Sequence, residues 1–204
     1  MQNTYQLIIF ARAPVYGQVK QRLARDIGKA AALEFYNNTL TDLIARLQNG
    51  PWSLSVSVAT PGDQHHSAFA GVTTAEQLPG DLGLRMRTVL DSYTGCKRII
   101  IGSDIPEIEP AHIHDAFEKL SNHDLVFGPA TDGGFWLVGC SKEQVTDEPA
   151  DQVFMRDVRW SSCYALADTL QTLSPHKRVA TVCTLSDVDD QKAYQQYQQR
   201  SQMG

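Results

Sequence analysis

The chain has 204 residues, of which 42% are hydrophobic, and its formal net charge is −5. This length and composition suit one folded domain with a substantial core, so we predict a single domain over residues 1–204. The negative net charge argues against a global basic surface for nucleic acid, and any anion-binding site must therefore be local. No apolar run approaches the ~20 residues that cross a bilayer, so we expect no membrane span.

The start of the chain and its cysteines bear on where the protein works. The chain enters a strand-like run almost at once, without the basic region and cleavage site of a secretory signal. No pair of cysteines has the spacing of a zinc knuckle or a redox motif. We therefore expect reduced thiols in a cytoplasmic protein. The cysteines are Cys96, Cys140, Cys163 and Cys183.

Short apolar runs alternate with segments of helical periodicity along the whole chain. The runs that predict strands cover residues 5–10, 54–59, 98–101, 124–127 and 178–185. Helices are predicted at residues 21–47, 82–93, 110–120, from 161 or 162 to about 173, and from 191 onward. After Cys140 the chain turns polar up to Asp151, which predicts a surface excursion. Such alternation predicts a mainly parallel sheet in a layered α/β domain.

A basic segment follows the first predicted strand. Arg12, Lys20, Arg22 and Arg25 place four positive charges within fourteen residues, with no acid among them. Gly17 lets the backbone approach a ligand, and the start of the next helix offers free N–H groups. We interpret the segment as a phosphate-binding loop, with a solvated basic helix face as the alternative. It is neither a Walker loop nor a dinucleotide fingerprint, because the required glycines are missing.

Acidic residues follow two of the predicted strands. A run of isoleucines leads through Gly102 and Ser103 to Asp104, and Asp187 and Asp189 follow the last strand. Ligands of open α/β sheets bind just beyond the carboxyl ends of the strands. Capping of a turn is the alternative role for Asp104. A basic loop with separated carboxylates suits a nucleotide–metal complex, since Mg²⁺ is commonly held by carboxylates and substrate phosphates.

Two glycine-containing turns complete the candidate site. Asp81 is placed to cap the helix that follows it, and Gly80 and Gly83 beside it suggest that backbone lies close to a ligand. Asp132 precedes two glycines between apolar segments, which is typical of a loop or a hairpin tip. Its carboxylate is suited to contact the hydroxyls of a sugar or an acceptor.

Taken together, these motifs resemble one bacterial family. Residues 14–23, 81–86, 102–106, 128–135 and 187–189 carry the resemblance, in order and over essentially the whole chain. The family consists of GT-A-type proteins assigned as nucleotide-diphospho-sugar transferases, some of them as glycosyltransferases of arsenosugar biosynthesis. Its wider superfamily includes molybdopterin and phospholactate guanylyltransferases. The resemblance implies a Rossmann-like GT-A three-layer α/β fold with a mainly parallel mixed sheet, a divalent metal, and transfer from an activated donor.

The resemblance also implies roles for individual residues. Asp104 and Asp189 resemble the family's metal-binding acids and are the predicted ligands of Mg²⁺ or Mn²⁺. From the basic loop and the spaced acids, we further expect that Lys20 and Arg22 would stabilise the leaving charge and that Asp132 would orient the acceptor or act as base. Gln21 stands where the family has threonine, and Phe135 where tyrosine is common. The predicted nucleotide-binding positions are Ala11, Arg12, Pro14, Gly17, Lys20, Arg22, Gly80, Asp81, Gly83 and Ser103.

Three functions are consistent with these residues. The leading hypothesis is a metal-dependent glycosyltransferase that moves a sugar from a nucleotide-diphosphate donor to a small-molecule acceptor. The second is a nucleotidyltransferase that joins an NTP to a small phosphorylated substrate and releases pyrophosphate. The third is a non-catalytic nucleotide-binding module, which the substitution at Gln21 keeps open.

Overall fold

A computed structural model describes residues 4–93, 95–142 and 154–201 of the chain. Its core is a seven-stranded sheet with strand order β3-β2-β1-β4-β6-β5-β7. Only β6 runs against its neighbours, and the remaining strands pair in parallel, which confirms the predicted mainly parallel mixed sheet. The strands are β1 Tyr5–Ala11, β2 Ser53–Val58, β3 Thr73–Glu76, β4 Lys97–Gly102, β5 Leu125–Pro129, β6 Phe135–Cys140 and β7 Val179–Thr181.

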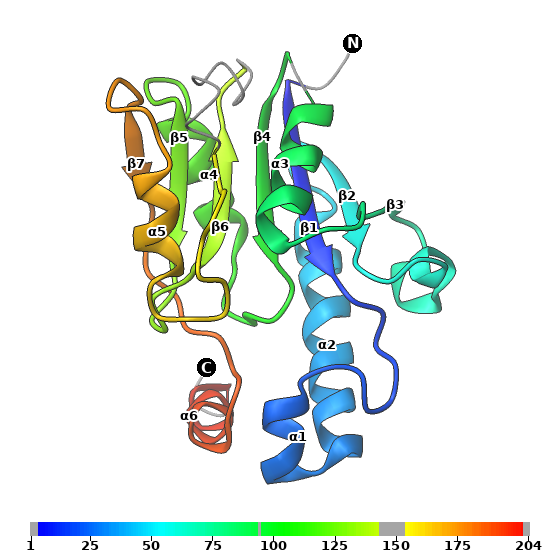
Figure 1. Ribbon diagram of the computed structural model, residues 1–204. Helices are drawn as coiled ribbons and strands as arrows, with labels where there is room; N and C mark the ends of the chain where they lie inside the picture. Colours follow the sequence, from blue (N-terminus) through cyan, green and yellow to red (C-terminus); the bar gives the residue numbers. More distant parts are fainter. Residues whose placement is uncertain (1–3, 94, 143–153, 202–204) are drawn as a thin grey trace.

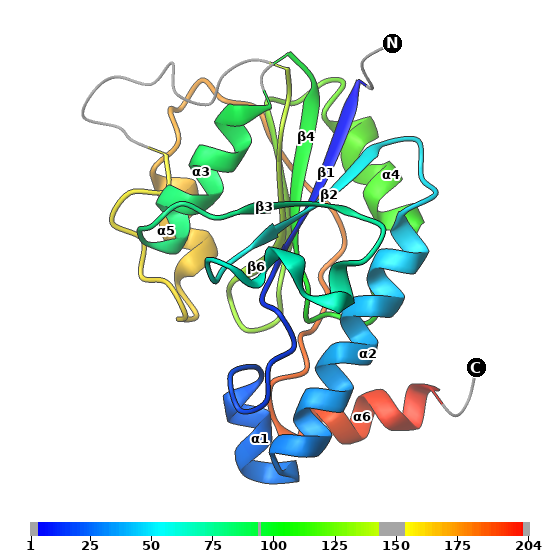
Figure 2. The same cartoon turned by 90° about the vertical axis from the view of Figure 1, so that its right-hand side faces the viewer.

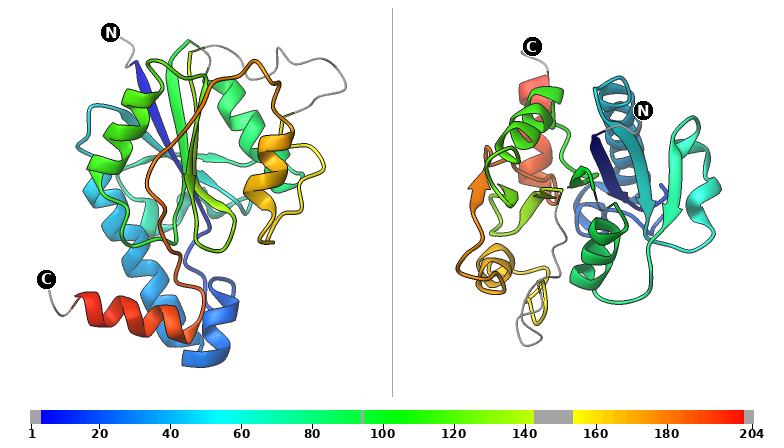
Figure 3. Two further views of the ribbon diagram at one scale, coloured as in Figure 1. Left: turned by 90° about the vertical axis from the view of Figure 1, so that its left-hand side faces the viewer. Right: turned by 90° about the horizontal axis from the view of Figure 1, so that it is seen from above.

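The helices cover both faces of this sheet and make three layers (Figures 1 and 3). One face packs on α2 and α4, and the other packs on α3 and on the segment that leads into α5. Two short 3₁₀ helices, Asp63–His65 and Ser67–Phe69, lie between β2 and β3. The α-helices are α1 Gln21–Ile27, α2 Lys29–Leu47, α3 Leu82–Ser92, α4 Pro110–Lys119, α5 Ala165–Gln171 and α6 Gln191–Ser201.

The central strands are apolar on both sides because both sides are covered. Ile8 faces the α3 layer, while Leu7 and Ile9 face the α2 layer, and all three are buried. Ile100 and its neighbours in β4 divide in the same way. A doubly covered parallel strand therefore appears in the sequence as a continuous apolar run, not as an alternating one.

One predicted helix was wrong in its continuity. The sequence predicts a single helix over residues 21–47, but Gly28 separates α1 from α2 with φ 87° and ψ 153°. This backbone conformation is open to glycine and costly for other residues. The break turns α1 back against α2 and α6, and Leu23, Phe35 and Val188 form a small separate core there (Figure 2).

Other boundaries differ from the sequence prediction by smaller amounts. The strand expected over residues 178–185 is short, and only a single bridge between Ala130 and Leu185 continues it. The helix expected from residue 161 or 162 begins at Ala165, because a turn closed by the hydroxyl of Ser162 precedes it. The strand β3 was not predicted. The surface excursion predicted up to Asp151 lies mostly outside the described residues.

The carboxyl ends of β1, β2, β4, β5 and β7 all lie at one edge of the sheet, since these strands run in the same direction. The segment after β1, the end of β4, the β5–β6 turn and the chain before α6 therefore meet there. In Figure 1 this edge is the lower one, above α1 and α6. None of the described helices is both long enough and apolar enough to cross a membrane.

Candidate functional site

A buried lysine joins the segment after β1 to the acids at the sheet edge. Lys20 precedes α1 in the left-handed conformation, with φ 44°, and its side chain is 5% exposed. Its Nζ donates to Oδ2 of Asp104 at 3.1 Å and to Oδ1 of Asp189 at 2.7 Å. Burial alone would lower the pKa of Lys20, but the two carboxylates outweigh it and the pKa is raised. The ammonium group therefore remains charged at neutral pH.

Three carboxylates converge at this point. Asp104, Asp187 and Asp189 each offer one oxygen to a group whose atoms lie within 4.8 Å of one another. Burial, together with repulsion from the neighbouring acids, raises the pKa of Asp187 to about 6. Such a group of oxygen ligands matches the chemistry of Mg²⁺ or Mn²⁺, which prefer carboxylates and leave room for substrate oxygens. The donor set therefore fits the metal that the sequence predicts.

A cavity of about 770 Å³ opens beside these acids, at the ends of β1 and β4. Its cationic side chains come from the basic segment and from α3. Most of the predicted nucleotide-binding positions line it. These lining residues are Ala11, Arg12, Lys20, Arg22, Asp81, Ser103, Asp104 and Asp189, together with Gln77 and Arg85.

A tyrosine from α2 fixes the back wall of this first cavity. The Tyr36 hydroxyl accepts from the backbone N–H of Arg12 and lies 3.1 Å from the Arg12 carbonyl, which it can donate to. Its oxygen is also 3.0 Å from Oγ of Ser103. Burial raises the pKa of Tyr36, so the hydroxyl stays protonated. The contacts tie the chain after β1 to the chain after β4, the two segments that carry Lys20 and Asp104.

The start of α3 forms another wall. Oδ1 of Asp81 accepts from the backbone N–H of Leu84 at 2.8 Å, which confirms the predicted helix cap. The sequence suggested that the backbone at Gly83 lies close to a ligand. In the structure, Gly83 instead lies close to Met155 and Trp160 of the same chain. A methyl group at this position would lie 2.4 Å from the Met155 carbonyl oxygen and 2.8 Å from the Trp160 ring. The glycine thus lets α3 pack against the segment before α5.

A second cavity, of about 450 Å³, adjoins the first across Asp104 and Asp189. Asp132, Asp187 and several aromatic side chains line it. Asp132 is exposed in the turn between β5 and β6, where its Oδ1 accepts from the backbone N–H of Gly134 at 2.8 Å. The predicted hairpin tip is confirmed, and the turn orients its carboxylate at the mouth of this cavity.

The remaining predicted positions shape the backbone and are absent from the lining of both cavities. Pro14 is buried, and Gly17 takes φ +72° in the turn before α1. Gly80 takes φ +137° directly before the cap of α3. These residues therefore set the path of the backbone around the site and do not line a cavity.

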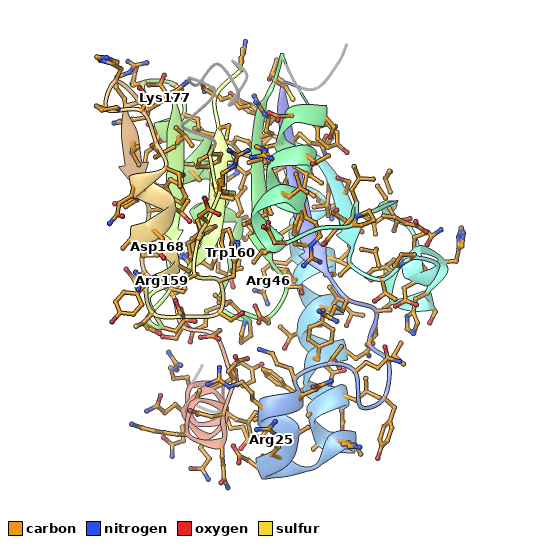
Figure 4. The ribbon with its side chains drawn as sticks, in the orientation of Figure 1. Arg25, Arg46, Arg159, Trp160, Asp168 and Lys177 are labelled. Atoms are coloured by element: carbon orange, nitrogen blue, oxygen red, sulfur yellow. The ribbon has the colours of Figure 1, made fainter. Side chains whose placement is uncertain are left out.

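The sequence pointed less clearly to several lining residues. Asp187 was noted in the acidic cluster but was not chosen as a ligand. Its spacing of two from Asp189 is the signal that could have selected it, since alternate residues of an extended segment share a side. Arg85 lies within the motif of residues 81–86 but was not chosen as a site residue. Tyr36 and Trp160 were not predicted, because the helical spacing around Tyr36 and the mixed segment around Trp160 point to no ligand. Figure 4 shows Trp160 beside Arg159 and Asp168, next to α5.

The segment that carries Trp160 is fixed by an ion pair. Arg159 donates from Nε and Nη2 to the two carboxylate oxygens of Asp168 at 2.8 and 2.7 Å, and its guanidinium lies 4.0 Å from the ring centre of Tyr164. Hydrogen bonds from Arg159 lower the pKa of Asp168 to about 2. The pair therefore persists through the physiological pH range and holds the segment against α5.

The fold of this chain is also found in proteins of known structure. It is the Rossmann-like α/β fold shared by nucleotide-diphospho-sugar transferases and nucleotidyltransferases. A provisionally assigned nucleotide-diphospho-sugar transferase from Desulfovibrio desulfuricans G20 superposes with a TM-score of 0.77 at 24% identity, covering 93% of this chain and 84% of that one.

More distant structures have the same fold. CMP-2-keto-3-deoxy-manno-octonic acid synthetase in complex with CTP superposes with a TM-score of 0.60 at 11% identity, over 98% and 99% of the two chains. Glucosyl-3-phosphoglycerate synthase from Mycobacterium tuberculosis, in complex with Mn²⁺, UDP-glucose and phosphoglyceric acid, gives 0.56 at 14% identity, over 91% and 70%.

At the level of sequence, residues 39–162 match a family described as uncharacterized proteins conserved in bacteria, DUF2064. The chain belongs to this family. No curated protein matches the sequence.

Proposed function

We propose that the protein is a metal-dependent glycosyltransferase that takes a sugar from a nucleotide-diphosphate donor. The observation that carries the proposal is the division of charge at the sheet edge: a basic cavity and a carboxylate-lined cavity meet at a cluster of three acids. A donor of this kind needs cationic groups for its diphosphate and a second space for the acceptor. Both requirements are met by residues of one domain.

The first cavity suits the nucleotide diphosphate. Its lining carries positive charge from Arg12, Lys20, Arg22 and Arg85. One arginine guanidinium group can donate two parallel hydrogen bonds to two oxygens of a phosphate. The pairing of Tyr36 with Ser103 and with the backbone of Arg12 preorganises the wall against which the nucleotide would lie. The predicted roles of Ala11, Asp81 and Ser103 are compatible with this arrangement, as lining residues.

Asp104, Asp187 and Asp189 are the residues that would hold the divalent cation. When bound, Mg²⁺ or Mn²⁺ would supply charge neutralisation to the departing diphosphate. Lys20 already supplies positive charge between Asp104 and Asp189, and it is positioned to pass from the carboxylates to a phosphate oxygen once a cation shares them. Arg22 lies 3.5 Å from Asp189 and is largely exposed, so it would contact the leaving diphosphate from the solvent-facing side of the site.

Asp132 is proposed to receive the acceptor. Its carboxylate lines the second cavity and is held by the N–H of Gly134, so it can accept a hydrogen bond from an acceptor hydroxyl. As the acceptor oxygen attacks the anomeric carbon, the same carboxylate can take its proton. The proposed catalytic groups are therefore Asp132 at the acceptor and Lys20 with Arg22 at the leaving diphosphate.

A nucleotidyltransferase is the second candidate function. It is favoured by the fold shared with the CTP-bound synthetase, and its chemistry would use the same acids at the α-phosphate of an NTP. Attack there by a phosphate oxygen of the second substrate would release pyrophosphate, whereas glycosyl transfer releases a nucleoside diphosphate.

The test is a thermal-shift screen of nucleoside diphosphates, nucleotide sugars and NTPs, with and without Mn²⁺. We expect a nucleoside diphosphate and one nucleotide sugar to raise the melting temperature in the presence of Mn²⁺. The Asp104→Ala variant should lose this metal dependence. If no nucleotide raises the melting temperature with Mn²⁺, the proposal fails, and release of pyrophosphate from an NTP would favour the second candidate.

A further inference from the structure

We infer that the second cavity selects an acceptor that is neutral or positively charged, hydroxylated, and built on a flat apolar body. Phosphorylated and carboxylated acceptors are excluded by the same cavity. The inference rests on the proposed function, because it names the acceptor class of that site.

The cavity has the position that an acceptor needs. It shares Asp104 and Asp189 with the first cavity, so a molecule bound in it would face the reacting end of a donor bound in the other. Its volume of about 450 Å³ falls within the range of small-molecule sites. The two cavities thus meet at the acidic cluster, where transfer would take place.

The charge of the second cavity is opposite to that of the first. Among the described residues that line it, Arg22 is the sole cationic one, and it already lies 3.5 Å from Asp189. A divalent cation on Asp104, Asp187 and Asp189, together with Lys20 and Arg22, would offset the charge of the three acids. A donor diphosphate in the first cavity would bring its own negative charges, and Asp132 adds another in the second cavity. A phosphate or carboxylate group would therefore be repelled here, whereas an ammonium group would be attracted.

The apolar part of the lining is aromatic. Phe135 and Trp160 pack edge to face at 6.2 Å between ring centres and are only partly buried, so ring surface remains available on both. Trp136 lies deeper, with its indole N–H donated to the Cys183 carbonyl at 3.0 Å. Partly exposed rings beside carboxylates favour a flat apolar body, and they add cation–π attraction if that body carries positive charge.

The experiment uses four probes that share one 4-hydroxyphenyl body on a two-carbon chain and differ in charge: tyramine, tyrosol, 4-hydroxyphenylacetate and 2-(4-hydroxyphenyl)ethyl phosphate. Binding to the 204-residue chain is measured by ligand-observed NMR, with Mn²⁺ replaced by Mg²⁺ and with UDP or GDP present. Tyramine and tyrosol should bind at least about tenfold more tightly than the two anions. Equal or tighter binding of the anions would overturn the inference, as would the absence of binding by all four.

Variants assign the effect to the cavity. Trp160→Ala should weaken tyramine and tyrosol by about tenfold, and Asp132→Lys should shift the preference toward the anions. Leu170→Ala, which removes a partly exposed apolar side chain on α5 away from the cavity, is the matched control and should change neither. Unchanged binding in both Trp160→Ala and Asp132→Lys would overturn the inference.

The same experiment separates this inference from the function on which it rests. Nucleoside diphosphate binding depends on the first cavity and is recorded in the same samples. If the nucleotide binds and the probes show no preference by charge, the acceptor class is wrong while the proposed function stands. If no nucleotide binds, the proposed function itself fails.

Discussion

Replacing Lys20 by methionine tests how the acidic cluster is held together. Methionine keeps most of the length of the side chain but removes the ammonium group that contacts Asp104 at 3.1 Å and Asp189 at 2.7 Å. Asp104, Asp187 and Asp189 would then repel one another with Arg22 as the nearest paired cation, and that side chain is 79% exposed. We expect Lys20→Met to be less stable than the wild type in the absence of divalent cations.

The magnitude follows from burial. Removing one partner of a fully buried ion pair costs about 3–5 kcal/mol. The carboxylates of Asp104 and Asp189 are 41% and 35% exposed, so water screens them and the cost falls to about 1–2 kcal/mol. For a domain of this size, each kcal/mol lowers the melting temperature by about 2–4 °C, which predicts a decrease of about 2–8 °C.

Divalent cations should reverse this loss. A ligand at about 100 times its Kd stabilises a protein by about 2.7 kcal/mol. In the wild type, the cation must displace the ammonium group of Lys20 from two carboxylates, whereas in the variant it meets no such competitor. Mn²⁺ should therefore raise the melting temperature of Lys20→Met by more than it raises that of the wild type, and should bind the variant more tightly. Nucleoside diphosphates should bind the variant more weakly.

Calorimetric melting in EDTA and in Mn²⁺, with isothermal titration of Mn²⁺, provides the measurement. Lys29→Met is the matched control. Lys29 is exposed at the start of α2, and its replacement removes the same charge without affecting the contacts that Lys20 makes with the acids. If Lys20→Met melts like the wild type in EDTA and responds equally to Mn²⁺, then Lys20 does not balance the charge of the cluster.

Three further predictions concern the stability of the fold. Asp124→Asn should cost about 1 kcal/mol at neutral pH, because Asp124 accepts three hydrogen bonds from Arg178. Those bonds lower the pKa of Asp124, so its stabilising effect is complete above the unfolded-state pKa of ~3.9 and is lost as the pH falls below it; the difference in melting temperature between wild type and variant should disappear in acid. Gly83→Ala should lower the melting temperature and change tryptophan fluorescence, since the added methyl would meet the Met155 carbonyl at 2.4 Å; an unchanged spectrum and melting temperature would contradict this packing role. Arg98→Leu should cost at least about 3 kcal/mol in urea unfolding, because Arg98 is fully buried and donates to backbone carbonyls; a smaller loss would show that water or rearrangement satisfies those carbonyls.

Much of the fold follows from local pattern. The apolar runs of β1 and β4 are buried on both faces, which is why they could be predicted as central parallel strands. Asp81 caps α3 and Pro110 begins α4 as the sequence predicts, because capping involves only residues of the same turn. The break at Gly28 was missed, since the apolar residues on both sides of it keep a helical spacing.

Parts of the candidate site could be predicted for a similar reason. Residues that follow parallel strands must meet at one edge, so Lys20, Asp104 and Asp189 could be expected near one another from topology alone. Trp160 could not, because it belongs to no strand end and reaches the site through packing against Phe135 and Gly83. Contacts of this kind depend on how layers pack, and a single sequence carries no periodic signal for them.

The sequence by itself therefore determined the class of fold, the basic character of the segment after the first strand, and the two acids proposed as metal ligands. Only the tertiary structure decided that Asp187 joins those acids, that Lys20 lies between two of them, and that a second cavity of opposite charge lies beyond. The physical reason is that charge type and strand order are properties of the chain, whereas distances between side chains from different loops are set by the packed layers that carry them.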